Sequence, residues 1–168
     1  MKRLLLIWIA LAFGTTGATT ILQSVTLPEL VRESDRAIVA EVLRVEYGYD
    51  ENRLPSTRVT LRVEETLFGK VSDETLEIKL FGAPTKMDDG LRLFVDGTPR
   101  YQRGDRYLLL LIPTSKWGFT NTAGLGFGAF KVSADGREIE HTYRPEREAY
   151  LPFRERLIRL KETAAAAP

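Results

Sequence analysis

Apolar and polar residues alternate along several stretches of this chain, and the alternation predicts β-strands. Segments 58–64 and 75–81 alternate strictly, so each predicts a strand with one buried face and one solvent face. Segment 37–46 predicts a longer strand. The consecutive apolar residues Val42 and Leu43 interrupt its alternation and indicate a bulge. Residues 47–52 are rich in turn formers and predict the connection to the next strand.

The segment Tyr107–Ile112 has no alternation at all. It follows the turn pair Gly104-Asp105 and contains six consecutive apolar or aromatic residues before Pro113. Six residues are too few to span a membrane, and a run bounded by turn residues is typical of a strand that is covered on both faces. Such a strand lies at the centre of a closed barrel or beneath a second layer. We therefore expect the fold to be organised around it.

Two helices are predicted, one near each end of the folded region. Segment 26–34 has Thr26 at the cap position and Glu29 three residues later, which is the capping-box pattern. Segment 151–161 places Leu157, Ile158 and Leu160 on one side of a second helix. We expect residues 19–26 to be a flexible leader and residues 162–168 to be a disordered tail.

The remaining segments complete the expected architecture. Segment 124–132 alternates glycine with larger residues and is predicted to continue as a strand, followed by a hairpin turn at 134–137. The long loop 82–103 contains Leu91–Val95, which fits either a short strand or one helical turn. The pattern therefore predicts at least five strands of a meandering type in a single domain spanning residues 27–161.

The first 18 residues have the features of a secretory signal peptide. Lys2 and Arg3 precede the ten-residue apolar run Leu4–Phe13, and small residues at 14–18 offer a cleavage site. Ten helical residues span about 15 Å, about half of a bilayer core, so a cleaved signal is favoured over an anchor. We expect the protein in the periplasm of a bacterium or outside the cell.

Composition narrows the range of partners. Without Lys2 and Arg3 the chain has 22 basic and 23 acidic residues, a net charge of −1. Because phosphate contacts need a basic surface, nucleic acid is not expected as a partner. Cysteine is absent, so neither disulfides nor a lipid-anchored cysteine is expected. We expect no stable membrane insertion after the signal is cleaved.

No group of residues has the spacing of a catalytic or metal site. His141 is the only histidine, and a zinc site would need further His, Cys or carboxylate ligands at suitable spacing. No G-x-S-x-G motif surrounds a serine. The alternating glycines at 124, 126 and 128 are not followed by a helical pattern, so a phosphate-binding loop is not favoured. We expect no catalytic residue, no metal and no cofactor.

Aromatic residues in predicted loops are the candidate binding residues. Rings at loop tips can form a contact surface for a sugar or a peptide, or they can close the end of the barrel. Both alternatives remain open from the sequence. The candidates are Tyr47, Tyr49, Tyr101, Trp117 and Phe119.

Three segments, 30–42, 63–69 and 104–110, together resemble the netrin-like module found in tissue inhibitors of metalloproteinases. Similar small exported proteins occur in bacteria. The resemblance covers about residues 27–132 and implies a mainly β fold, a five-stranded OB-like Greek-key barrel with a short N-terminal helix and a C-terminal helix. In those inhibitors an N-terminal cysteine chelates the protease zinc, and this chain has no cysteine to do so.

These observations favour an exported, non-enzymatic binding module of the bacterial cell envelope. Its expected partner is a protein or a cell-wall polymer. Two alternatives follow from the same sequence. One is a protease inhibitor of the netrin-like type that acts without the N-terminal cysteine, and the other is an enzyme whose site has no recognisable motif.

Overall fold

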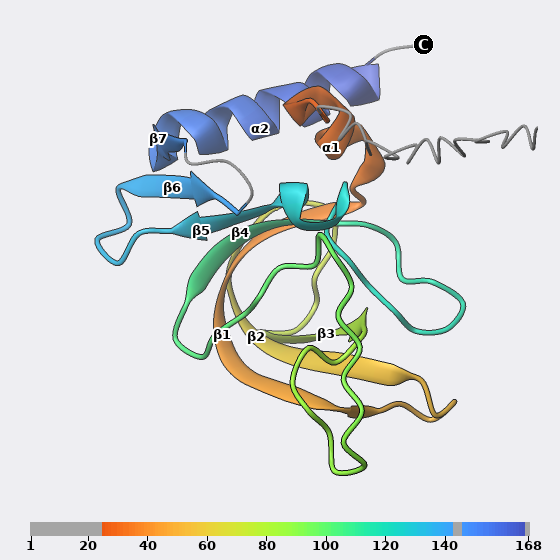
Figure 1. Ribbon diagram of the computed structural model, residues 1–168. Coiled ribbons are helices and arrows are strands. Elements are labelled where there is room, and N and C mark those ends of the chain that lie inside the picture. The colour runs from red at the N-terminus through yellow and green to blue at the C-terminus, as the bar shows by residue number, and fades with distance from the viewer. Residues whose placement is uncertain (1–24, 143–145, 167–168) are drawn as a thin grey trace, which may run out of the picture.

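A computed structural model describes residues 25–142 and 146–166 (Figure 1). The predicted signal peptide 1–18 and leader residues 19–24 lie outside the described residues. These described residues form two α-helices, a 3₁₀ turn and seven strands. In order they are α1 Leu27–Glu33, β1 Arg36–Tyr49, β2 Pro55–Phe68, β3 Thr75–Phe81, β4 Arg106–Leu111, η1 Leu125–Gly128, β5 Ala129–Val132, β6 Glu138–His141, β7 Arg147–Ala149 and α2 Tyr150–Ala166.

All seven strands belong to one antiparallel sheet with the order β3-β2-β1-β4-β5-β6-β7. The spatial order β4-β1-β2-β3 is that of a Greek key. A mainly β fold with one helix near each end is therefore confirmed. The prediction of a closed barrel of five strands is wrong, because the sheet has seven strands and is open, with β3 and β7 at its edges.

The sheet stays open because a loop lies where β3 and β4 would have to pair. The long strands β1 and β2 curl over the interior (Figure 1), and β1 carries bulges, as predicted. After β4 the chain runs toward β3, where the amide of Thr120 donates to the carbonyl of Lys79 (2.8 Å). Thr122 forms an isolated bridge with Leu111 on the other side. Segment 112–124 thus lies between the two strands.

The hydrophobic core is divided by the central strand β4. Leu108 and Leu110 pack on one side with Phe153 and Leu157 of α2. Tyr107, Leu109 and Leu111 face the curved interior of the sheet. Residues 107–111 are only 0–4% exposed. The prediction that this segment is a strand covered on both faces is confirmed.

Two predicted strand boundaries are wrong. Residues 47–49 belong to β1 rather than to a turn, because they pair with residues 55–57 of β2. Leu125–Gly128 forms the 3₁₀ turn η1, and the strand begins only at Ala129. Gly124 has a positive φ of 58°, and a Cβ on Gly128 would lie 2.7 Å from the carbonyl oxygen of Ala123. The glycines therefore serve a tight turn against the preceding segment, not a strand.

Both predicted helices are present, and two features of their ends bear on the predictions: the cap of α1 and the last residue of α2. The capping box between Thr26 and Glu29 is present as predicted. Helix α2 extends to Ala166, so the prediction of a disordered tail from residue 162 is wrong for 162–166. Alanine has the highest helix propensity, which explains the extension. Within the described residues, no helix combines the length and hydrophobicity needed to cross a membrane.

The double burial of β4 makes a stability prediction. Leu109→Ala should lower the free energy of unfolding by about 2 to 5 kcal/mol, because it removes buried methyl groups and leaves a cavity. Urea denaturation followed by circular dichroism measures the change. Leu151→Ala, at a position 64% exposed, is the control and should change stability by less than about 0.5 kcal/mol. Equal losses in the two variants would contradict the central position of β4.

Candidate functional site

The loop between β3 and β4, residues 82–105, lies over the curled ends of β1 and β2 (Figure 1). It begins at Gly82, whose φ is +99°. A Cβ at this position would lie 2.9 Å from Cγ2 of Val95. Glycine therefore allows Leu93–Val95 to pack closely against the end of β3, where the amide of Leu93 donates to the carbonyl of Ala83 (2.8 Å).

Further hydrogen bonds hold this loop at other points. The hydroxyl of Tyr49 on β1 donates to the carboxylate of Asp89, and this bond raises the pKa of Tyr49 and lowers the pKa of Asp89. The Tyr107 hydroxyl lies 3.3 Å from the carbonyl oxygen of Arg100. Burial, with the nearby carboxylate of Asp105, raises the pKa of Tyr107. Tyr107 therefore remains a neutral hydrogen-bond donor, and the loop is attached to both β1 and β4.

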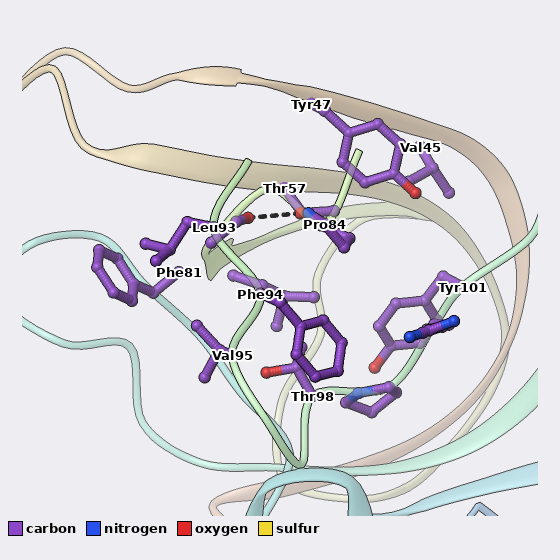
Figure 2. Close-up of a pocket in the computed structure, with 14 residues that line it drawn as sticks. Val45, Tyr47, Thr57, Phe81, Pro84, Leu93, Phe94, Val95, Thr98 and Tyr101 are labelled. Atoms are coloured by element: carbon purple, nitrogen blue, oxygen red, sulfur yellow. Dashed lines mark hydrogen bonds between the residues drawn. The ribbon is translucent and has the colours of Figure 1, made fainter. Parts of the chain in front are cut away.

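A groove lies between this loop and β1, and we call it the aromatic groove. Its outer part has a volume of about 540 Å³, within the range of small-molecule sites. Figure 2 shows the residues that line the inner part; among them, Tyr47, Phe94 and Tyr101 also line the outer part. The residues that line the outer part include Tyr47, Pro84, Arg92, Phe94, Arg100 and Tyr101.

The inner part of the aromatic groove is narrow and mostly apolar. Its free volume of about 20 Å³ is enough for one water molecule. The walls include Val45, Leu80 and Val95, together with the ring of Tyr101. The hydroxyl oxygen of Thr98 is buried in this wall and has no hydrogen-bond partner among the described residues (Figure 2).

The charged residues that line the outer part are both arginines. Arg100 lies over the ring of Phe94, with its guanidinium carbon 5.2 Å from the ring centroid. Within residues 25–142 and 146–166, no carboxylate forms an ion pair with Arg92 or Arg100. The lining of the groove is therefore positively charged.

Two of the five candidate aromatic residues line this groove. Tyr47 is 40% exposed at its opening, whereas Tyr101 is only 4% exposed. The ring of Tyr101 packs edge-on against Tyr107 (5.2 Å between centroids). Tyr101 therefore closes the end of the core, which is the second of the two alternatives that the sequence left open. Tyr49 does not line the groove but holds the loop through Asp89.

The other two candidates lie on segment 112–124. Phe119 is half-buried and packs edge-on against Phe81, with 5.7 Å between centroids. Phe81 in turn lines the inner part of the aromatic groove. Trp117 is 53% exposed and lines neither part of the groove. The five aromatic residues thus do not form one surface.

Sequence reasoning missed Arg92, Phe94 and Arg100. The segment Leu91–Val95, which contains Arg92 and Phe94, fits either a short strand or one helical turn from its sequence, and it forms neither, apart from the isolated bridge at Leu93. Only the alternation of Arg92 and Phe94 with apolar neighbours in Leu91–Val95 could have indicated that these side chains point away from the core. The site depends on the path of the loop, which this pattern does not determine.

His141 lies in a different place, beside a second cavity of about 390 Å³. Its Nε2 is 3.1 Å from Oε1 of Glu148, and Arg156 donates to Oε2 of the same carboxylate (2.6 Å). Burial raises the pKa of Glu148, but the hydrogen bonds from His141 and Arg156 outweigh it and lower the pKa overall. The imidazole packs edge-on against Phe130 and Phe153, and these two rings also contact each other. This cluster links β6, β7 and α2.

Neither a metal-ion cluster in the described residues nor a match to a family model or a curated protein adds to these observations. No group of three His, Cys, Asp or Glu residues suited to a metal ion occurs in the described part of the chain. No family model matches the sequence, and no curated protein matches it.

The close packing at Gly82 predicts that a Cβ there would disturb the groove. Gly82→Ala should lower stability by about 1 to 2 kcal/mol because of its positive φ, and should displace Leu93–Val95. Gly104→Ala is the control, because Gly104 also has a positive φ but no atom within 4 Å of its Cβ position. Ring-proton chemical shifts of Tyr47 and Phe94 should change only in Gly82→Ala. Unchanged shifts in that variant would contradict the packing described here.

Asp50, at the β1–β2 turn, makes a pH prediction. Burial raises its pKa, but hydrogen bonds from the amides of Leu54 and Asn52 and from Lys79 outweigh this and lower it below the usual 3.8. Ionised Asp50 therefore stabilises the fold at pH values above 3.8. This stabilisation is lost as the pH falls through the lowered pKa that Asp50 has in the folded protein. Nζ of Lys79 also lies 4.8 Å from the centroid of the Phe119 ring, so Lys79 contacts both Asp50 and segment 112–124.

Asp50→Asn should be less stable than the wild type at pH 7, and the difference should shrink as the solution is acidified below pH 3.8. Urea denaturation across this pH range measures it. The exposed Asp73→Asn is the control and should follow the wild type throughout. A difference for Asp50→Asn that stays constant down to pH 2 would contradict the assignment.

Proposed function

We propose that the protein is an exported, non-enzymatic binding module of the bacterial cell envelope, and that the aromatic groove is its binding site. The observation that carries the proposal is the composition of the groove. Aromatic rings and arginines, which line it, are the residues most enriched among strong binding contacts. Phe94 is 51% exposed although the loop that carries it is hydrogen-bonded to the sheet.

Preorganisation supports the same proposal. The loop 82–105 is attached to β1 through Tyr49 and to β4 through Tyr107, so its conformation does not depend on a partner. Binding to a preformed site costs less conformational entropy than binding that orders a loop. A groove already formed in the free chain is therefore suited to recognition.

The proposal includes the export of the protein and its relationship to OB-like folds. The signal-peptide pattern of residues 1–18 supports a location in the periplasm or outside the cell. The Greek-key order of β1 to β4 supports a relationship to the OB-like folds, as an open variant. The netrin-like resemblance, and with it protease inhibition, stays a prediction.

The proposal is tested with variants of the mature protein immobilised for capture from an envelope extract. A partner bound by the wild type should be lost with Tyr47→Ala and with Phe94→Ala, because both remove exposed rings from the groove. Trp117→Ala is a matched control, since it removes an equally exposed ring outside the groove. Circular dichroism confirms that each variant is folded. A partner captured equally by all variants, or lost only with Trp117→Ala, would contradict the proposal.

A further inference from the structure

We infer that the aromatic groove selects small amphipathic anions, in which a flat aromatic or apolar body carries one carboxylate, sulfonate or phosphate group. The inference rests on the proposed function, that the groove is a binding site. It goes further by naming the chemistry of the ligand. Three features of the groove carry it: the unpaired arginines, the way Arg100 is held, and the apolar surface beside them.

The first feature is charge. Arg92 and Arg100 line the outer groove, and no carboxylate of the described part of the chain lines it. Three acidic side chains of the same loop have partners outside the groove: Asp89 accepts from Tyr49 and the amide of Leu91, Asp96 accepts from the amide of Gly97, and Asp105 pairs with Lys131. The fourth, Asp88, is exposed and lines neither part of the groove. A bound anion would therefore meet two guanidinium groups without competition from an internal carboxylate. A cation would be repelled by both.

The second feature is how Arg100 is held. Its guanidinium lies over the ring of Phe94, and its carbonyl oxygen lies 3.3 Å from the Tyr107 hydroxyl. A cation–π contact with a ring uses none of the guanidinium's N–H donors, so these donors can bind two oxygens of one anionic group. The contact with Phe94 thus holds the Arg100 guanidinium in place, and its positive charge is not neutralised by a carboxylate of the described residues.

The third feature is the apolar surface that adjoins the charges. The rings of Tyr47, Phe94 and Tyr101 and the ring of Pro84 line the outer groove, and Val45 and Val95 continue this surface inward. The outer volume of about 540 Å³ accommodates a ligand of two or three rings. Because cationic and apolar walls share one groove, an anion with an attached apolar body fits better than either part alone.

Two fluorescent probes separate the two parts of the inference. The first is 1-anilinonaphthalene-8-sulfonate, which is an anion. The second is N-phenyl-1-naphthylamine, which has the same rings and no charge. The wild type should bind the anionic probe about tenfold more tightly than the neutral probe, as expected for one charge-assisted contact. Fluorescence titration measures both affinities.

The arginine variants test the selectivity. Arg92→Gln and Arg100→Gln should each weaken binding of the anionic probe by about tenfold and change binding of the neutral probe by less than about twofold. Arg103→Gln is the matched control, because Arg103 is an exposed arginine of the same loop that does not line the groove. It should leave both affinities unchanged. An equal loss with Arg103→Gln would overturn the inference, since it would indicate a general effect of charge.

Phe94→Ala distinguishes failure of the inference from failure of the proposed function. If it weakens both probes while the arginine variants change neither, the groove binds ligands but does not select anions, and only the inference fails. If neither probe binds, or if Phe94→Ala changes neither affinity, the inference fails, and the capture experiment with Phe94→Ala decides separately whether the proposed function stands.

Discussion

The burial of β4 on both faces is the constraint on which the rest of the structure depends. Leu108 and Leu110 pack beneath the helices, while Leu109 and Leu111 fill the curved interior of the sheet. A strand with no solvent face requires a covering layer on each side. Helices α1 and α2 supply one layer, and the curled strands β1, β2 and β3 supply the other. Strand β4 thus joins the two cores, together with the first part of β1, where Ala37 and Val39 lie in one core and Ile38 and Ala40 in the other.

The candidate site is a consequence of this arrangement. The curled strands reach past β4, and the chain must return from β3 to β4 through the long loop 82–105. The loop crosses the ends of the strands and is fixed there by Gly82, Tyr49 and Tyr107. The groove that remains between the loop and β1 combines the ring of Tyr47 from the sheet with aromatic rings and arginines from the loop. Core packing and the binding surface therefore depend on the same chain path.

Local patterns predicted the elements well where a single physical rule dominates. Strand β3 was predicted with its observed bounds by alternation alone, and the capping box of α1 by the spacing of Thr26 and Glu29. The closed barrel was wrong because closure depends on whether β3 and β4 can meet, which no local pattern determines. Segment 112–124 occupies that position, as the hydrogen bond from Thr120 to Lys79 shows.

The site was predicted only in part for a related reason. Tyr47 was selected as a loop aromatic and does line the groove, although it lies on β1. Tyr101 was selected by the same rule but is buried, because the loop folds back onto the core. Arg92 and Arg100 carry no local signal of a site, since an arginine in a loop is usually only solvated. Their significance appears only when the loop brings them to the same groove.

Native-state hydrogen exchange of the free protein tests the central claim, that the doubly buried strand and the attached loop form the groove before any partner binds. Amides of Leu108–Leu111 should exchange only through global unfolding, since every one of these residues is buried. The amides of Gly82 and Leu93, which are bonded to the carbonyls of Pro55 and Ala83, should also be protected in the absence of ligand. Exchange of the loop amides at unprotected rates, with β4 still protected, would contradict a preformed groove.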